Sequence, residues 1–323
     1  MATSHHLKRR RLAVVVSLAG ALVPVAPVQL DSSTFGTQSA LAAVRESARS
    51  TIPRSPAARS GYGWPVKPFD RQHPVRGFFG DPRIGGAHGD AKQFHFGVDV
   101  SAANGTPVYA TITGTVSFIH PDAISVSGRN GVSFEYWHIV PSVRPGQSVK
   151  AYKTVVGRVE KPWAHVHFSE RRNGIYVNPL RAGAMGPFAD DTDPVVRAIH
   201  VHRRGTEFTV TADVTDETPL PVSAPWSDLP VMPAVVRWRL IGGSAAPSAW
   251  RTVVDFRLTI PSAGAFSSVY APATQQNHAN TPGLYRVRLA NLRAAAAGRD
   301  IQIIATDLSG NDGALREPVV VDS

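Results

Sequence analysis

Two histidines separated by one residue stand in the stretch HVHFSERRNGIYV, which begins at His165 and is otherwise rich in β-prone residues. Because side chains alternate between the two faces of a strand, the imidazoles of His165 and His167 would project from the same face and could reach one point in space. Neutral imidazole is a common ligand of divalent metals. The spacing therefore predicts a metal ion beside this strand.

The remaining ligands must be histidines or carboxylates, because the chain has twelve histidines and no cysteine. A catalytic zinc site needs three protein ligands and one open position. The strongest partner motif is FHFGVDV, in which His95 and Asp99 are four residues apart. That spacing also suits one face of a helix, but the glycine and the valines of the motif favour a strand. Such a strand would place His95, Gly97 and Asp99 on one face, with Gly97 leaving room for the ion.

Short β-prone runs must position these residues. From Gly61 onward such runs alternate with turn signals, and no segment shows a sustained helical pattern. His138 lies in one of these runs, VSFEYWHIV, and is a further candidate ligand. The region 61–187 is therefore predicted to be a mainly β domain.

A stretch of acids and proline, FADDTDP at 188–194, predicts a domain boundary. Five further β-prone runs follow it, with alternating apolar and polar residues and a closing DLSGN turn. They predict a β-sandwich-like domain over 188–323. The five runs are 207–216, 234–241, 252–260, 283–292 and 299–312.

A second H-x-H pair, His200 and His202, occurs in AIHVHRR at the start of this C-terminal region. By spacing alone it competes with the first pair as a metal site. The adjacent Arg203 and Arg204 would disfavour a bound cation. The pair is therefore interpreted as an exposed strand face.

With these motifs laid out, the chain resembles the lysostaphin/LytM-type zinc metallopeptidases of the M23 family, whose signature is H-x-x-x-D early and H-x-H late. The resemblance runs from about Trp64 to Leu180, and it implies an antiparallel β-sheet catalytic domain over 61–187. The loop VEKPWAH departs from the family pattern, because it lacks the usual glycines and serine. A shorter, stiffer loop carrying Trp163 is expected to reshape the substrate groove and so to affect specificity more than metal binding. The resemblance includes the stretches GFFGDPR, GTPVYATITGTVSFI, EYWH, VRPGQSVKAYKTVVGRV and HVHFSERRNGIYVNPL.

The resemblance also implies a role for each candidate residue. His95, Asp99 and His167 would bind one Zn²⁺ per chain, and His165 and His138 would be catalytic. Such a centre brings the pKa of bound water down to about 7. A neighbouring histidine can accept the proton of that water and later protonate the leaving amine.

The N-terminus carries a basic cluster at 8–11 followed by an uncharged apolar run to residue 30. This order predicts a signal peptide or an N-terminal anchor over 1–30. Residues 31–60 are rich in serine, alanine and arginine and are predicted to be a linker. The expected location is secreted, periplasmic or associated with the cell envelope.

The net charge of +10 includes the four basic residues of that cluster. The remaining excess of about six positive charges favours anionic cell-wall polymers as partners. Specific nucleic-acid binding is not expected, because the basic residues match no recognition motif. Oligomeric state is left open by the sequence.

The leading hypothesis is an exported zinc metalloendopeptidase that hydrolyses peptide cross-links in bacterial peptidoglycan. One alternative is a non-catalytic protein on the same fold that binds cell wall or activates an amidase. Relatives of that kind typically lose ligands, whereas all five residues of the expected site are present here. The other alternative is a zinc peptidase that acts on free peptides.

Overall fold

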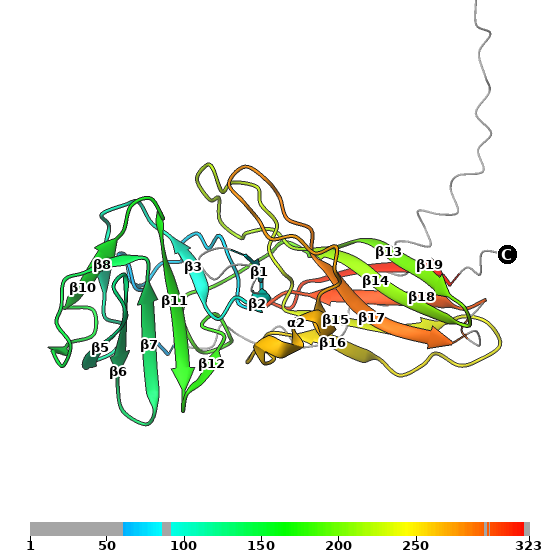
Figure 1. Ribbon diagram of the computed structural model, residues 1–323, viewed down its shortest axis with the longest axis horizontal. Coiled ribbons are helices and arrows are strands. Elements are labelled where there is room, and N and C mark those ends of the chain that lie inside the picture. The colour runs from blue at the N-terminus through cyan, green and yellow to red at the C-terminus, as the bar shows by residue number, and fades with distance from the viewer. Residues whose placement is uncertain (1–60, 86–91, 294–295, 297, 320–323) are drawn as a thin grey trace, which may run out of the picture. The chain divides into compact units, whose positions relative to one another are not determined.

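The computed structural model describes residues 61–85, 92–293, 296 and 298–319 (Figure 1). The predicted signal peptide or anchor at 1–30 and the predicted linker at 31–60 lie outside the described residues. The described residues of both β regions belong to one compact unit. Within the described ranges, no helix has the length and apolar character needed to cross a membrane.

The first β region is organised around a seven-stranded antiparallel sheet (Figure 1). Six strands follow the order β12, β11, β7, β6, β5 and β9, and β3 pairs with β11. The strands are β3 (Val98–Ser101), β5 (Gly114–His120), β6 (Ala123–Ser127), β7 (Val132–Trp137), β9 (Ser148–Val149), β11 (His165–Arg172) and β12 (Ile175–Val177).

Two smaller antiparallel sheets complete this region. One joins β1 (Pro82–Ile84) to β2 (Lys92–Phe94). The other places β10 (Val155–Val159) between β4 (Pro107–Tyr109) and β8 (Ile139–Pro141).

Strand β11 is buried on both faces along most of its length. Val166 and Phe168 belong to the apolar core, where the ring of Phe168 stacks on Phe134 with centroids 5.2 Å apart. Because side chains alternate along a strand, the odd-numbered His165 and His167 share the opposite face. The apolar side chains of β11 therefore anchor the strand, and its imidazoles are left for a polar site.

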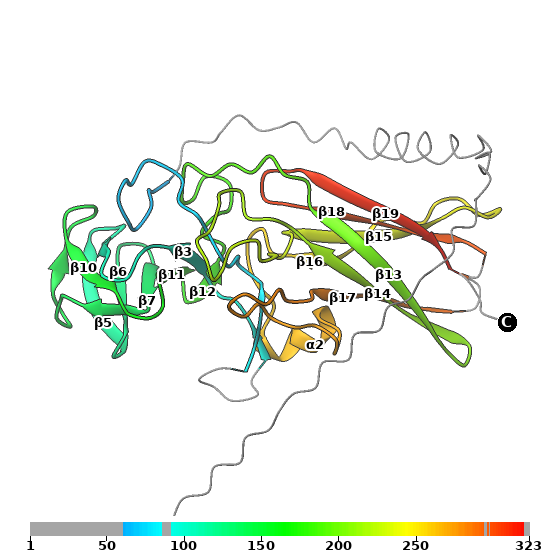
Figure 2. The ribbon, with the colours of Figure 1, turned by 90° about the horizontal axis from the view of Figure 1, so that it is seen from above.

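The C-terminal region contains a three-stranded and a four-stranded antiparallel sheet (Figure 2). Alternating residues of both sheets, such as Val210 and Val287 in the first and Val236 and Ile303 in the second, are buried in the apolar core. The first sheet has the order β13 (Val195–Arg204), β14 (Glu207–Thr215), β17 (Arg286–Arg293). The second has the order β16 (Arg251–Asp255), β15 (Val235–Ile241), β18 (Asp300–Thr306), β19 (Asp312–Pro318).

Helical structure in the described residues is limited to the short segments η1 (Ala263–Ala265) and α2 (Phe266–Val269). The mainly β, antiparallel fold class predicted from the sequence is therefore confirmed.

Two local predictions were wrong. The predicted strand over FHFGVDV is broken, because β2 ends at Phe94 and β3 begins at Val98. The backbone of His95 instead binds an adjacent loop, with its amide donating to Asp81 O at 2.8 Å and its carbonyl accepting from Gly80 N at 2.8 Å. His138 likewise lies in a bend between β7 and β8, with φ at 63°.

Candidate metal centre

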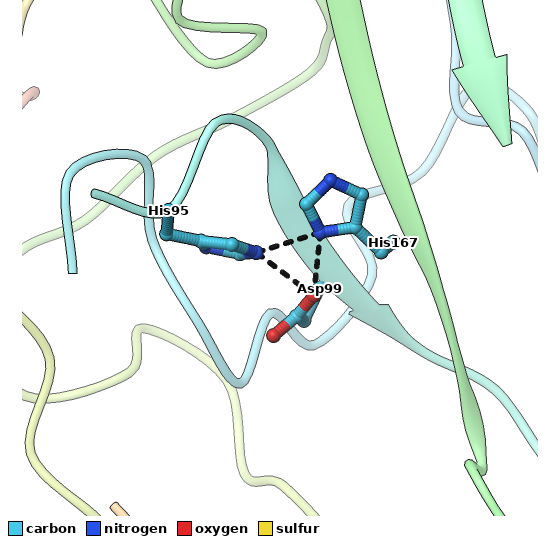
Figure 3. Close-up of side chains that lie close together, drawn as sticks. All are labelled: His95, Asp99 and His167. Atoms are coloured by element: carbon cyan, nitrogen blue, oxygen red, sulfur yellow. Dashed lines mark hydrogen bonds and ion pairs between the residues drawn. The ribbon is translucent and has the colours of Figure 1, made fainter. Parts of the chain in front are cut away.

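The two polar motifs meet where β3 pairs with β11. In this antiparallel register Asp99 lies directly opposite His167, and side chains in such positions have their Cβ atoms about 5 Å apart. His95 approaches from the loop that precedes β3. Figure 3 shows the three side chains converging from these elements, and each of them is buried.

The three facing atoms form a compact triangle. His95 Nε2 lies 2.7 Å from His167 Nδ1 and 3.1 Å from Asp99 Oδ1, and the last two atoms are 3.2 Å apart. Two ligands of a tetrahedral zinc, each about 2.0–2.2 Å from the metal, lie roughly 3.3 Å apart. The triangle therefore has nearly the dimensions that a tetrahedral zinc requires of three of its ligands.

The tautomer of His95 leaves a lone pair on Nε2, the ring nitrogen that faces Asp99 and His167. His95 Nδ1 lies 2.8 Å from the carbonyl oxygen of Phe78, which can only accept a hydrogen bond. The Nδ1 proton must therefore point to Phe78, and Nε2 presents its lone pair to Asp99 and His167. A lone pair and a carboxylate oxygen directed at one point suit a cation.

The other two candidate ligands are also oriented from outside. His167 Nε2 lies 2.8 Å from Ser169 Oγ, and Arg83 Nη2 donates to Asp99 Oδ2 at 2.8 Å. Hydrogen bonds of this kind fix the ring orientation and basicity of metal ligands.

Burial and neighbouring charges keep the three facing atoms, which would bind the metal, free of protons at neutral pH. Burial, reinforced by the charge of Arg83, lowers the pKa of His95 to about 3. Burial also lowers the pKa of His167. For Asp99 burial acts in the opposite direction, but His95, His165 and Arg83 outweigh it and hold the pKa of the carboxyl well below its usual value. Two neutral imidazoles and one carboxylate therefore face each other.

Gly97 lies against strand β11, which leaves no room for a side chain at this position. The sequence had predicted instead that the glycine leaves room for the ion. A Cβ atom at this position would lie 2.5 Å from Phe168 O, 2.5 Å from Ser169 Oγ and 2.8 Å from His167 Nε2. These contacts are too close for any carbon atom. The absence of a side chain lets the loop approach β11 closely enough for His95 to reach His167.

His165 lies beside this triangle. Its Nε2 is 3.4 Å from Asp99 Oδ1. Its Nδ1 is 2.8 Å from the carbonyl oxygen of Trp163 and 2.7 Å from Arg76 Nη2. Arg76 can only donate, so its 2.7 Å contact is made with the Nδ1 lone pair. A proton on Nδ1 would be donated to Trp163 O, and Arg76 would then have to move away. Both tautomers of His165 therefore have a partner.

His138 lies on the far side of His165. The centroid of its ring is 4.8 Å from that of His165 and 6.4 Å from that of His167. Burial, together with the nearby His165 and His167, lowers the pKa of His138 to about 3, so the ring is neutral. Its other face stacks on Trp163, with centroids 4.2 Å apart.

The second H-x-H pair has a different environment. His200 lies on β13, where its Nε2 is hydrogen-bonded to Asp213 Oδ2 on the neighbouring strand at 2.8 Å, and His202 is exposed. Neither histidine belongs to a group of three potential metal ligands in the part of the chain that the structure describes. The structure therefore brings together His95, Asp99 and His167 and leaves this pair apart.

Several contact residues were not identified from the sequence. Arg83 occurs in the quoted GFFGDPR stretch, but no feature of that stretch indicated a contact with Asp99. Arg76 precedes the same stretch, and its guanidinium carbon lies 4.1 Å from the centroid of the Trp226 ring. Trp226 lies far away in the sequence. Ser169 could have been found, because it continues the alternation that places His165 and His167 on one face of β11.

Comparisons with known proteins relate part of the chain to a peptidase family. Residues 93–179 match the family model of Peptidase family M23. The protein named DD-carboxypeptidase/endopeptidase Mpg is 30% identical over 112 residues, both in Neisseria meningitidis serogroup B and in Neisseria gonorrhoeae. The match covers 31% of this chain and 25% of each relative, so the chain spans a quarter of the length of these curated relatives.

Solved structures with local similarity include two peptidases. A zinc-containing peptidase from Vibrio cholerae is 24% identical, with 38% of this chain and 39% of that chain covered and a TM-score of 0.30. The catalytic domain of the prophage-encoded M23 protein EnpA from Enterococcus faecalis is 26% identical, with 40% of this chain and 100% of that chain covered and a TM-score of 0.27.

Proposed function

We propose that this chain, whose residues 93–179 match the family model of Peptidase family M23, is a zinc-dependent metalloendopeptidase that hydrolyses peptide cross-links in bacterial peptidoglycan. The observation that carries the proposal is the convergence of His95 Nε2, Asp99 Oδ1 and His167 Nδ1 within 3.2 Å of one another. Two further imidazoles stand beside them. Binding without catalysis would not require this full set.

His95, Asp99 and His167 would hold the zinc ion. When bound, zinc would polarise the scissile carbonyl and make a water molecule acidic enough to attack it near neutral pH. The hydrogen bonds that His95 makes to Phe78 O and that His167 makes with Ser169 Oγ keep the two ligand imidazoles in place.

His165 would move the proton. With its Nδ1 proton donated to Trp163 O, its Nε2 lone pair lies on the same side as Asp99 and can accept a proton from the attacking water. The same nitrogen can then protonate the leaving amine. His138 is neutral, so its single N–H group would donate to the oxygen on which negative charge develops.

The peptidoglycan substrate rests on the relatives and on the N-terminal sequence. The named relatives are a carboxypeptidase and endopeptidase. The signal peptide or anchor predicted over 1–30 would place the protein in the cell envelope or outside the cell, where peptidoglycan is found. The basic balance of the chain would help it to approach anionic wall polymers.

The chain offers a matched pair of variants that test this function. His167→Ala removes the second histidine of the first H-x-H pair, and His202→Ala removes the second histidine of the other. We expect zinc content and digestion of purified sacculi to be lost in His167→Ala and unchanged in His202→Ala. Digestion by His167→Ala at the wild-type rate would overturn the enzymatic proposal.

The substrate class is tested separately. Wild-type protein would be incubated with sacculi and with casein, and the products would be identified by mass spectrometry. We expect cleaved cross-links from sacculi and intact casein. Efficient casein cleavage with intact sacculi would show instead that free peptides or proteins are the substrate.

A further inference from the structure

A second group of potential metal ligands lies in the C-terminal region and shares no residue with the centre described above. It consists of Asp190, Asp216 and Asp307, and one oxygen from each carboxylate lies within 4.8 Å of the other two. Asp190 belongs to the segment that leads into β13, Asp216 directly follows β14 and Asp307 directly follows β18. Their residues are only 4%, 2% and 4% exposed.

Two of these carboxylates have an oxygen without a partner. Asp190 Oδ1 accepts hydrogen bonds from Thr192 N at 3.0 Å and Thr192 Oγ1 at 2.6 Å, and Asp216 Oδ1 accepts from Glu217 N at 2.9 Å. The Oδ2 atoms of Asp190 and Asp216 are buried, and no residue in the described part of the chain donates to them. Burying such an atom without compensation is costly.

Asp307 is held in a fixed orientation by its own turn. Its Oδ1 accepts from Ser309 N at 2.9 Å and Asn311 N at 2.8 Å, and its Oδ2 accepts from Asn311 Nδ2 at 2.7 Å. Each carboxylate oxygen can accept more than one interaction. Asp307 therefore keeps free capacity while its position is set.

Among the described residues, no positively charged side chain compensates the three carboxylates. In the described ranges, no ion pair joins any of them to a lysine, arginine or histidine. Burial, with a contribution from Asp190 and Asp307, raises the pKa of Asp216 to about 8. Burial, with a contribution from Asp190, raises the pKa of Asp307 to about 6. The folded chain thus collects acidic groups without a protein cation to balance them.

Space for a small ligand adjoins the cluster. A cavity of about 10 Å³ is bordered by Asp216 and Asp307, and Phe78 and Met232 are among its apolar walls. A volume of this size admits roughly one water-sized particle.

We propose that Asp190, Asp216 and Asp307 bind a calcium ion. All three ligands are carboxylates, which are preferred by hard cations and not by zinc in the absence of imidazole or thiolate. Three equally spaced oxygens that are each about 2.4 Å from one Ca²⁺ are at most about 4.2 Å apart, so the group, whose oxygens lie within 4.8 Å of one another, is close to the size that calcium requires. Mg²⁺ keeps several of its waters, and the small cavity leaves little room for them.

The bound ion would fasten a connecting segment. Asp190 lies between the M23 region and β13, whereas Asp216 and Asp307 lie at the ends of two strands of the C-terminal sheets. The backbone of Asp190 already binds the turn after β18, through Ser309 Oγ at 3.0 Å and Asn311 Nδ2 at 2.8 Å. Calcium would add charge neutralisation to these hydrogen bonds and stabilise the C-terminal region.

Equilibrium dialysis of the zinc-loaded full chain against radioactive calcium tests the proposal. We expect one calcium per chain, an affinity at least about tenfold weaker in Asp216→Asn and in Asp307→Asn, and no change in Asp255→Asn. Asp255 is a suitable control because its carboxylate pairs with Arg257 at the surface of the same region. Absence of calcium binding in the wild type, or equal binding in all the variants, would overturn the proposal.

Thermal unfolding gives a second readout that does not depend on the variants being equally stable. We expect calcium at about 100 times its Kd to raise the Tm of the wild type by roughly 5 °C or more. The same rise is expected in His167→Ala, so the calcium site is tested whether or not the zinc proposal holds. If the carboxylates merely share protons, calcium will not change the Tm, and Asp216→Asn will be as stable as the wild type or more stable.

Discussion

Replacement of Gly97 by alanine tests how the fold assembles the metal centre. The added methyl group would be placed 2.5 Å from two oxygen atoms of β11 and 2.8 Å from His167 Nε2. Because these contacts are at least about 0.5 Å too short, either the loop that carries His95 or strand β11 must move. Overpacking of this kind costs about 1–3 kcal/mol of the free energy of unfolding.

The same displacement should weaken zinc binding. Metal–ligand distances tolerate deviations of about 0.2 Å, which is smaller than the shift that Gly97→Ala demands. We therefore expect zinc affinity to fall at least about tenfold, which corresponds to about 1.4 kcal/mol. Zinc affinity would be measured by competition with a chromogenic chelator, and stability by thermal unfolding.

Gly264→Ala is the matched control. A methyl group added to Gly264 would have no atom within 4 Å, and the residue does not adopt a positive φ, so its replacement should change neither quantity. If Gly97→Ala and Gly264→Ala bind zinc equally and unfold at the same temperature, the close approach of the His95 loop to β11 is not what builds the site.

Variants at three further positions separate ligand support from catalysis. His165→Ala should retain zinc, as measured by elemental analysis, but lose about 10²–10⁴-fold in kcat on a cross-linked peptide, because the proton acceptor is removed; loss of zinc would instead make His165 a ligand. Ser169→Ala removes the outer partner of His167, and a chelator competition should show zinc affinity reduced about 10–100-fold; an unchanged affinity would refute that supporting role. Trp163→Ala should lower kcat/KM about two- to tenfold, since ring stacking on His138 is worth about 0.5–1.5 kcal/mol. Trp163→Phe keeps an aromatic ring and should restore most of the lost kcat/KM. Equal kinetics for both variants would show that the stacking has no function.

Much of the site followed from local sequence pattern. The alternation of side chains on a strand was enough to place His165 and His167 on one face of β11, and the pairing of β11 with β3 then puts Asp99 opposite His167. The sequence set the second H-x-H pair apart through its cationic neighbours and its position after the predicted boundary at 188–194.

The remaining features depend on contacts between distant segments. The break at His95 arises from backbone hydrogen bonds to Gly80 and Asp81, and no local propensity signals them. At the bend, the backbone of His138 adopts a left-handed conformation that its β-prone neighbours do not suggest. The three aspartates of the proposed calcium site come from three separate segments, so no motif could have grouped them.

Anomalous diffraction at the zinc absorption edge, from crystals of the wild-type protein, tests the metal centre most directly. We expect one peak per chain, about 2.0–2.2 Å from His95 Nε2, Asp99 Oδ1 and His167 Nδ1. A peak at His200 and His202, or no peak between the three expected ligands in protein supplied with zinc, would contradict the proposed centre.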